Sequence, residues 1–210
     1  MKFRPEDFDA IIFDLGGVIL NLDYNKTIEA FQKLGMDNFE EYYAQAQQDA
    51  IFDDFEIGKI SEDEFRAYFK KTIDPNLLDV DIDYAWNSML LDLPEHRVEF
   101  LKAIKDKVKI ILFSNTNANH LKEFRKIIKQ EYGNEKLLES LFNTTYYSHI
   151  LGQRKPNPPA FHSILHEQDL KAGKVLFIDD SIQHVEGAKI AGLQAYHLVD
   201  KDITEIFDLS

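Results

Sequence analysis

The chain has 210 residues and no cysteine. Without thiols it cannot form a disulfide or a zinc–thiolate site or use a cysteine nucleophile, and nothing in it points to an oxidising compartment. It also lacks any stretch near the roughly 20 apolar residues of a membrane span. Its first residues contain no apolar run typical of a secretory signal. These absences predict a cytoplasmic protein that does not contact membranes.

Basic residues are scarce: Lys and Arg number 24 against 37 Asp and Glu, a formal net charge of -13. An acidic chain gains nothing from the phosphate backbone of DNA or RNA, so no nucleic-acid partner is expected. Most of this acidity is typical of a solvated surface. If the substrate is an anion, a metal ion or a few lysines must supply positive charge locally. We expect a small-molecule substrate and a monomer or weak dimer.

Apolar runs, by contrast, recur along the chain, and 44% of its residues are hydrophobic, enough for a folded core. Strands are predicted at residues 10–13, 109–113 and 174–178, with weaker ones at 144–147 and 195–199. Helical patterns lie between them at residues 94–104, 120–128, 158–165 and 182–191. This alternation indicates an α/β fold with a doubly wound parallel sheet. In such sheets ligands bind beyond the carboxyl ends of the strands.

Residues 21–92 interrupt the alternation. They contain amphipathic segments at 27–34 and 39–52, and a third begins at Ser61, which forms a capping box with Glu64. No buried strand is evident there, so we predict a helical domain inserted after the first strand. The predicted division is a core domain of residues 1–20 and 93–210 and an inserted domain of residues 21–92.

Polar side chains follow three of the predicted strands. They are Asp14 after the first, Ser114 and Asn115 after the second, and Asp179 and Asp180 after the third, with Lys155 in a loop between the last two. Each alone is compatible with a helix cap or a solvated lysine. Together they place carboxylates, a hydroxyl, an amide and an ammonium group at one edge of the sheet.

This combination favours phosphoryl transfer. Adjacent carboxylates repel each other unless a cation lies between them, and Mg²⁺ binds a few carboxylate oxygens while keeping water or substrate oxygens. A carboxylate such as that of Asp14 can attack phosphorus and form an acyl-phosphate. The transition state then requires neutralising charge and fixed donors. Mg²⁺, Lys155, Ser114, Asn115 and the backbone amides of the Gly16–Gly17 turn can supply them.

Four segments, in this order, resemble the motifs of the haloacid dehalogenase-like superfamily. They are Phe13–Val18, Leu112–Asn115, Arg154–Pro156 and Phe177–Asp180. The resemblance covers the whole chain, because residues 21–92 lie where that family places its cap domain, and it implies a Rossmann-like core. Gly58–Ser61 and Glu186–Ala188 extend it to the branch of α-D-glucose-1-phosphate phosphatase and the phosphatase domain of soluble epoxide hydrolase.

The resemblance implies a role for each matched residue. Asp14 is the nucleophile and a metal ligand, the Gly16 carbonyl is a metal ligand, and Leu15 or Gly16 offers backbone contacts to the substrate. Ser114 and Asn115 bind the phosphoryl group, and Lys155 holds the phosphate and orders Asp14. Asp179 and Asp180 complete the Mg²⁺ site, and the sequence leaves open which of them binds the metal directly.

Gly16 departs from the usual pattern, in which a second aspartate two positions after the nucleophile protonates the leaving oxygen. General acid–base help is typically worth 10²–10⁴-fold, so either another group replaces this aspartate or turnover is slow. Asp23 is the candidate replacement, and its alternative role is to cap the helix that follows. His184 stands where the related pattern often has asparagine, and no role is assigned to it.

The turn from Phe55 to Lys59 resembles the cap loop that touches the leaving group in this family, although a plain interhelical turn has the same pattern. Glu56 or Lys59 is a candidate for bonding substrate hydroxyls. The aromatic residues of the inserted domain are more typical of a packed core than of a sugar-stacking surface. They include Tyr42, Tyr43, Phe52, Phe55 and Trp86.

The expected function is a Mg²⁺-dependent phosphatase that hydrolyses small phosphorylated metabolites, with sugar phosphates first, through an aspartyl-phosphate on Asp14. One alternative is a weakly active or inactive member that binds phosphorylated ligands, which Gly16 motivates. Another is a 2-haloacid dehalogenase, which needs no metal and would leave the pair Asp179 and Asp180 unexplained.

Overall fold

A computed structural model describes residues 2–37, 39 and 51–209, and its five parallel strands form one sheet in the order β3-β2-β1-β4-β5. In chain order the strands are β1 (Ala10–Phe13), β2 (Lys109–Ser114), β3 (Thr144–Tyr147), β4 (Val175–Asp179) and β5 (Gln194–His197). All five predicted strands are present with small shifts at their ends. The predicted α/β class is therefore confirmed.

The register of the central strand β1 with its neighbours determines which residues stand side by side at the carboxyl edge of the sheet. Its residues are all apolar and completely buried, as expected for a strand covered on both faces. Phe13 pairs with Leu112 of β2 and with Ile178 of β4. One residue further along, Asp14 and Asp179 therefore stand side by side at the carboxyl edge of the sheet.

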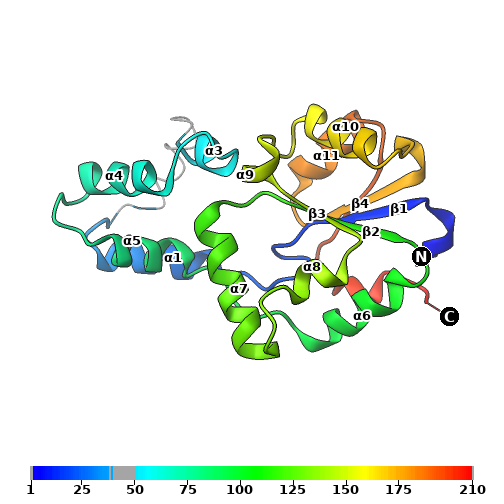
Figure 1. The fold of residues 1–210 in the computed structure, drawn as a ribbon, viewed down its shortest axis with the longest axis horizontal. Coiled ribbons are helices and arrows are strands. Elements are labelled where there is room, and N and C mark those ends of the chain that lie inside the picture. Colours follow the sequence, from blue (N-terminus) through cyan, green and yellow to red (C-terminus); the bar gives the residue numbers. More distant parts are fainter. Residues whose placement is uncertain (1, 38, 40–50, 210) are drawn as a thin grey trace.

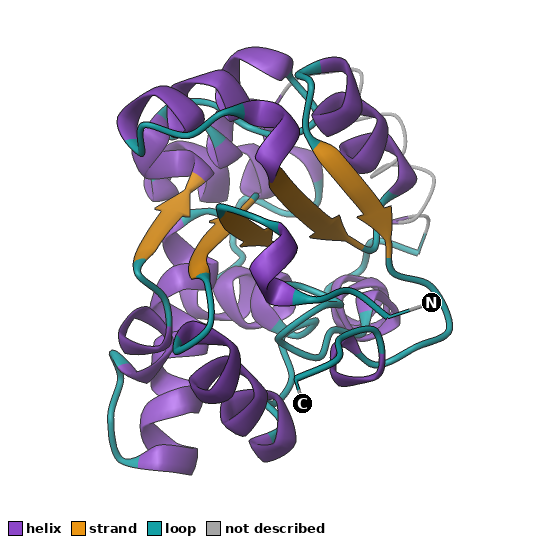
Figure 2. Cartoon of the chain, turned by 90° about the vertical axis from the view of Figure 1, so that its right-hand side faces the viewer, coloured by secondary structure: helices purple, strands orange, loops and turns teal. Residues whose placement is uncertain are grey.

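Helices cover both faces of the sheet, as Figures 1 and 2 show. One face is covered by α6 (Glu95–Lys105), α7 (Ala118–Tyr132) and α8 (Leu137–Leu141), and the other by α10 (Pro158–Glu167) and α11 (Ile182–Ile190). Successive strand residues point to opposite faces, so Ile11 and Phe13 enter one core and Ile12 the other. Shorter elements are α9 (Ser148–Leu151), η1 (Pro5–Asp7), η2 (Ala172–Lys174) and η3 (Ile203–Glu205).

The segment after β1 forms a separate helical layer beyond α7 and α9 (Figure 1). Its helices are α1 (Tyr24–Lys33), α3 (Ile51–Glu56), α4 (Glu62–Thr72) and α5 (Asp79–Asn87). The predicted capping box is confirmed, because Ser61 Oγ accepts from the Glu64 amide while the Glu64 carboxylate accepts from the Ser61 amide. We call this layer the cap.

Aromatic side chains fill the interior of the cap. Phe55 stacks on Phe65 with ring centroids 4.1 Å apart, and Phe52 stacks on Trp86 at 5.4 Å. All four side chains belong to one buried cluster. The core interpretation is thus confirmed for Phe52, Phe55 and Trp86, while Tyr42 and Tyr43 lie outside the described residues.

The helices of the cap match the predicted pattern only in part. The segment predicted at residues 39–52 falls mostly outside the described residues, which show α3 only from Ile51 onward. The sequence-based prediction missed α5, because Val80 and Tyr84 are exposed apolar residues that blur its pattern. Its buried face is carried by Ile82, Ala85 and Trp86.

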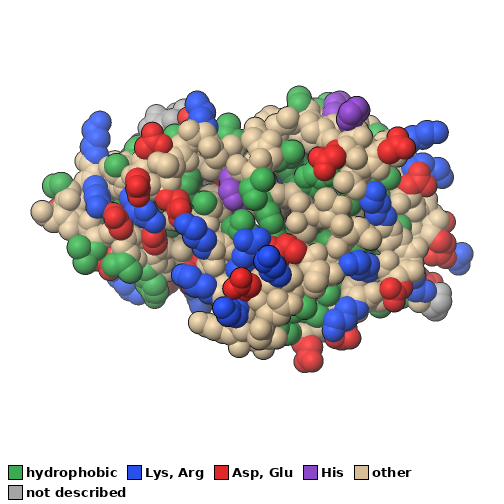
Figure 3. All heavy atoms as spheres, in the orientation of Figure 1, with side chains coloured by type: hydrophobic (Ala, Val, Ile, Leu, Met, Phe, Trp, Pro, Cys, Tyr) green, Lys and Arg blue, Asp and Glu red, His purple; other side chains and the backbone are tan. Residues whose placement is uncertain are grey.

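The surface mixes both signs of charge on the face drawn in Figure 3, where basic and acidic side chains lie interspersed and form no continuous basic stripe. Across the part of the chain that the structure describes, no helix is long and apolar enough to cross a membrane.

Candidate active site

A buried lysine of the third motif contacts carboxylates of the first and fourth motifs. Lys155 is completely buried, and its Nζ lies 2.6 Å from Asp14 Oδ1 and 2.7 Å from Asp179 Oδ2. Burying an unpaired ammonium group is costly, and here two carboxylates offset that cost. Burial alone would lower the pKa of Lys155, but the charges of Asp14 and Asp179 outweigh it and raise that pKa. The lysine is therefore a fixed positive charge beside the predicted nucleophile.

Apolar rings hold this lysine in place. Its Nζ lies 5.4 Å from the ring centroids of both Phe113 and Phe177, which belong to β2 and β4. Both rings are fully buried. The ammonium group of this loop lysine therefore lies in a buried, apolar environment, where water does not screen its interaction with Asp14.

Asn115 clamps the backbone of Lys155. Its Nδ2 donates to the Lys155 carbonyl and its Oδ1 accepts from the Lys155 amide, both at 2.9 Å. This reciprocal pair fixes the third motif against the second. The Ser114 side chain is buried at the end of β2, with its Oγ 3.4 Å from the Asn115 carbonyl. The phosphoryl-binding roles implied for Ser114 and Asn115 stay predictions.

Asp179 is saturated by protein contacts. Besides Lys155, its carboxylate accepts from the Ser181 amide at 2.8 Å and lies 3.0 Å from His184 Nδ1. Burial favours the neutral carboxyl, but Lys155 and His184 outweigh it and lower the pKa of Asp179 to about 2. His184 therefore has a definite partner that the sequence pattern did not reveal, because the contact depends on how α11 leaves β4.

Three carboxylates form a potential cation site. Ligand oxygens of Asp14, Asp179 and Asp180 all lie within 4.8 Å of one another. Gly17 allows this convergence, because a Cβ there would lie 2.2 Å from Asp180 Oδ2. Burial raises the pKa of Asp14 to about 7, and burial followed by the charge of Asp179 raises that of Asp180. Crowded carboxylates that resist ionisation together are the environment that a divalent cation relieves.

The Leu22 side chain packs against the glycine at position 16. A Cβ on Gly16 would lie 2.5 Å from Leu22 Cδ1, so Leu22 fills the space beside it. Asp23, the predicted substitute for the missing acid, caps α1 through its Oδ1, which accepts from the Asn25 amide at 3.1 Å. The structure thus shows Asp23 in the capping role that the sequence offered as its alternative.

The cap reaches the core through Arg154, the residue before Lys155. Arg154 forms ion pairs with Asp53 and, at 2.9 Å between Nε and Oε2, with Glu56. Gly58 allows the turn after α3 to approach α9 closely, because a Cβ at this position would lie 2.3 Å from the His149 carbonyl oxygen. The sequence predicts Glu56 or Lys59 as a partner for substrate hydroxyls, and its pattern does not reveal the pairing of Glu56 with Arg154.

Lys59, the other candidate of this turn, has a different environment. Its Nζ bonds the Asp54 carboxylate at 2.9 Å, and its side chain is 65% exposed. It therefore forms a surface ion pair within the cap.

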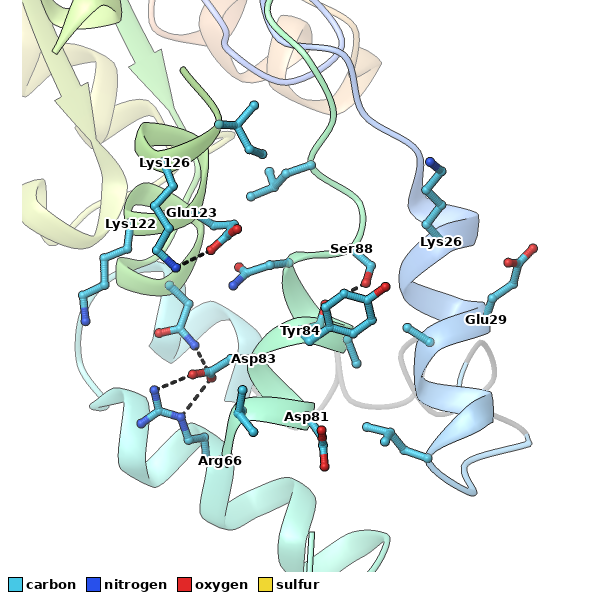
Figure 4. Close-up of a pocket in the computed structure, with 18 of the residues that line it drawn as sticks. Lys26, Glu29, Arg66, Asp81, Asp83, Tyr84, Ser88, Lys122, Glu123 and Lys126 are labelled. Atoms are coloured by element: carbon cyan, nitrogen blue, oxygen red, sulfur yellow. Dashed lines mark hydrogen bonds and ion pairs between the residues drawn. The ribbon is translucent and has the colours of Figure 1, made fainter. Parts of the chain in front are cut away.

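A separate cavity of about 870 Å³ lies between α1, α4, α5 and α7. Figure 4 shows Arg66 of α4 and Asp83 of α5 facing each other there. Asp83 accepts from Arg66 Nε at 2.9 Å and from Asn119 Nδ2 of α7 at 2.8 Å, which ties the cap to the core. None of the described residues that line this cavity belongs to the carboxylate cluster. The cavity is therefore distinct from the predicted catalytic centre.

Comparison with known proteins identifies the family. A family model described as haloacid dehalogenase-like hydrolase matches residues 8–192, which is most of the chain. The chain belongs to this family.

This haloacid dehalogenase-like hydrolase is similar to a named phosphatase and to a crystallised enzyme of the family. It is 27% identical over 187 residues to D-ribitol-5-phosphate phosphatase of Bacteroides thetaiotaomicron, covering 89% of each chain. A HAD family enzyme from the same organism, crystallised with magnesium and inorganic phosphate, is 32% identical with a TM-score of 0.86, covering 96% of this chain and 100% of that one.

L-2-haloacid dehalogenase from Xanthobacter autotrophicus is more distant, at 17% identity and a TM-score of 0.60, covering 94% of this chain and 80% of that one. At that identity the likeness shows a shared fold alone. These relatives do not test the closer resemblance to α-D-glucose-1-phosphate phosphatase and soluble epoxide hydrolase, which stays a prediction.

Proposed function

We propose that this hydrolase is a Mg²⁺-dependent phosphatase of small phosphorylated metabolites, with polyol and sugar phosphates as its substrate class. One observation carries the proposal: Lys155 bridges Asp14 and Asp179, and a ligand oxygen of a third carboxylate, Asp180, lies within 4.8 Å of theirs. This is an anion-binding charge and a carboxylate nucleophile beside a cation site. The relatives that act on ribitol phosphate, or were crystallised with magnesium and phosphate, support it.

The contacts suggest which aspartate binds the metal directly. Asp179 already contacts Lys155, Ser181 and His184, whereas the Asp180 side chain is exposed at the edge of the cluster. We assign Asp14, Asp180 and the Gly16 carbonyl as metal ligands and Asp179 as the residue that holds Lys155. When bound, Mg²⁺ neutralises phosphate oxygens and the crowded carboxylates.

The chain's own residues then carry the reaction. The Asp14 carboxylate attacks phosphorus in line with the leaving oxygen and forms an aspartyl-phosphate, which water cleaves in the second step. Lys155 stabilises the charge on the phosphoryl oxygens and holds Asp14 in one orientation. The Ser114 hydroxyl and the backbone amides of Leu15 and Gly16 are the proposed further donors. Asn115 acts through the Lys155 backbone and is proposed to offer its remaining amide hydrogen to the phosphate.

The domain division and the remaining alternatives belong to the same proposal. Residues 1–20 and 93–210 are proposed as the catalytic core, with residues 21–92 as the cap that excludes water. A dehalogenase reaction would leave the clustered carboxylates without a purpose. A binding protein without turnover is the alternative that Gly16 motivates.

Phosphate release from a panel of polyol and sugar phosphates, with Mg²⁺ and with EDTA, tests the proposal. Metal-dependent turnover by the wild type that Asp14→Asn abolishes is the expected result. Metal-independent chloride release from 2-chloropropionate would support the dehalogenase instead. Binding of phosphate or a phosphate analogue by a folded wild type that turns over no ester would support the binding protein.

A further inference from the structure

The proposed phosphatase needs a proton donor that position 16 does not supply. A leaving alkoxide must be protonated in the first step, and water must be deprotonated in the second. Leu22 occupies the space that a side chain at Gly16 would need, and the Asp23 carboxylate is used as a helix cap. A carboxyl group on another element that faces the strand ends can supply this proton.

The end of α3 brings one further carboxyl group to this region. Glu56 pairs with Arg154. Arg154 directly precedes Lys155, so the Cα atoms of these two basic residues are about 3.8 Å apart. Lys155 contacts Asp14, and its charge also reaches Glu56. Glu56 is thus a cap residue within electrostatic range of the lysine that orders the nucleophile.

The surroundings of Glu56 favour a carboxyl group that can hold a proton. Its Oε2 is shielded from solvent and lies 2.9 Å from Arg154 Nε. One guanidinium faces two carboxylates, Asp53 and Glu56, so the cluster has one negative charge in excess. Burial raises the pKa of Glu56, Arg154 and Lys155 oppose this, and Asp53 adds to it.

The position of Glu56 is fixed by its neighbours in the chain. Phe55 is buried and stacks on Phe65, and Gly58 lies against the His149 carbonyl of the core. Such anchoring on both sides holds the side chain in one place relative to the strand ends, which proton transfer requires.

We propose that Glu56 is the general acid and base that replaces the aspartate missing at position 16. The inference rests on the proposed phosphatase reaction. In the first step the P–O bond to the alcohol breaks as Asp14 attacks, and protonated Glu56 gives its proton to the leaving oxygen. In the second step ionised Glu56 takes a proton from the attacking water, the P–O bond to Asp14 breaks, and phosphate, free Asp14 and protonated Glu56 result. One group serves both steps because the leaving oxygen and the water both lie opposite Asp14.

Glu56→Gln tests this role with two substrates. For an alkyl ester such as a polyol phosphate, whose leaving alkoxide must be protonated, kcat is expected to fall by about 10²–10⁴-fold. For p-nitrophenyl phosphate the stable phenolate leaves without help, so the first step persists while hydrolysis of the aspartyl-phosphate slows. Rapid mixing should then show a burst of p-nitrophenolate of about one equivalent per enzyme. A purely structural role would slow both steps and give no burst.

Asp54→Asn is the matched control, because Asp54 lies on the same helix and pairs with the exposed Lys59. It should leave both rates unchanged. Alkyl-ester turnover by Glu56→Gln within threefold of the wild type would overturn the proposal, and so would an equal loss on both substrates without a burst. A wild type that hydrolyses no phosphate ester would instead refute the proposed function itself.

Discussion

Arg154 and Lys155 are neighbours in the chain, yet each holds a pair of carboxylates in a different environment. Lys155 is completely buried and joins Asp14 to Asp179, both of which are placed by adjacent strands of one sheet. The Arg154 side chain is 22% exposed and joins the core to Asp53 and Glu56 of the cap. The first cluster lies within a rigid scaffold, whereas the second crosses between two packing units.

The difference in burial predicts different roles for the Lys155 and Arg154 clusters. A buried charge network that is fully paired fixes geometry but is severely destabilised when one member is removed. A partly solvated network contributes little to stability. We therefore expect the Lys155 cluster to set nucleophile geometry and the Arg154 cluster to tune proton transfer.

The largest effect is expected for Lys155→Met. It would leave Asp14 and Asp179 buried without their cation, at a cost of about 3–5 kcal/mol in the free energy of unfolding. Removing a charge that stabilises the transition state should also lower kcat by at least about 10²–10³-fold. Denaturant unfolding and steady-state kinetics measure both.

Lys59→Met is the matched control for stability, because the Lys59 side chain is 65% exposed and its loss should change stability by less than about 1 kcal/mol. If Lys155→Met unfolded at the same denaturant concentration as this control, the Lys155 cluster would not be the structural anchor described here.

An intermediate effect concerns pH in the absence of metal. The folded-state pKa of Asp14 is raised to about 7, chiefly by burial. Its folded carboxyl therefore binds a proton more tightly than the unfolded one, so stability declines as pH rises toward 7. The lowered pKa of Asp179, about 2, acts in the opposite sense only at more acidic pH. Burial also lowers the pKa of His120 to about 4, which adds stability as pH rises toward 6.5. The contribution of Asp14 is therefore measured against Asp14→Asn, which cannot titrate at this position: in EDTA, the Tm of the wild type should fall relative to that of the variant between pH 5 and pH 8.

Saturating Mg²⁺ should reduce this decline, since binding to the folded state favours ionised carboxylates. An equal change in Tm between pH 5 and pH 8 for the wild type and Asp14→Asn in EDTA would contradict the assignment.

The smallest effect is expected for Arg154→Met. Its partly exposed ion pairs should contribute about 1 kcal/mol or less to stability. Because Arg154 lowers the pKa of Glu56, its removal should raise that pKa and shift the loss of alkyl-ester activity to higher pH. The profile of kcat/KM against pH measures the shift.

Lys122→Met provides the comparison, because Lys122 and Glu62 also join α7 to the cap, at 2.5 Å. This pair has no place in the proposed proton transfer, so its loss should leave the pH profile unchanged. Equal shifts in both variants would indicate a general effect of loosening the cap.

Sequence patterns were sufficient for the five strands and for helices α6, α7, α10 and α11 of the core, but not for the short helices α8 and α9. Runs such as Ala10–Phe13 are apolar at every position, so burial on both faces is their only favourable state. The end of each run then places Asp14, Ser114 and Asp179 at one edge of a parallel sheet. The helix α5 was missed because its exposed Val80 and Tyr84 conceal the periodicity of its buried face.

The sequence alone therefore determined the α/β class, the inserted helical layer and the residues brought together at the strand ends. These follow from local hydrophobic periodicity and from the parallel arrangement of strands. Only the tertiary structure decided that Leu22 fills the space beside Gly16, that Asp179 is saturated by Lys155 and His184, and that Arg154 meets Glu56. Such contacts depend on how separate elements pack in three dimensions, which no spacing along the chain encodes.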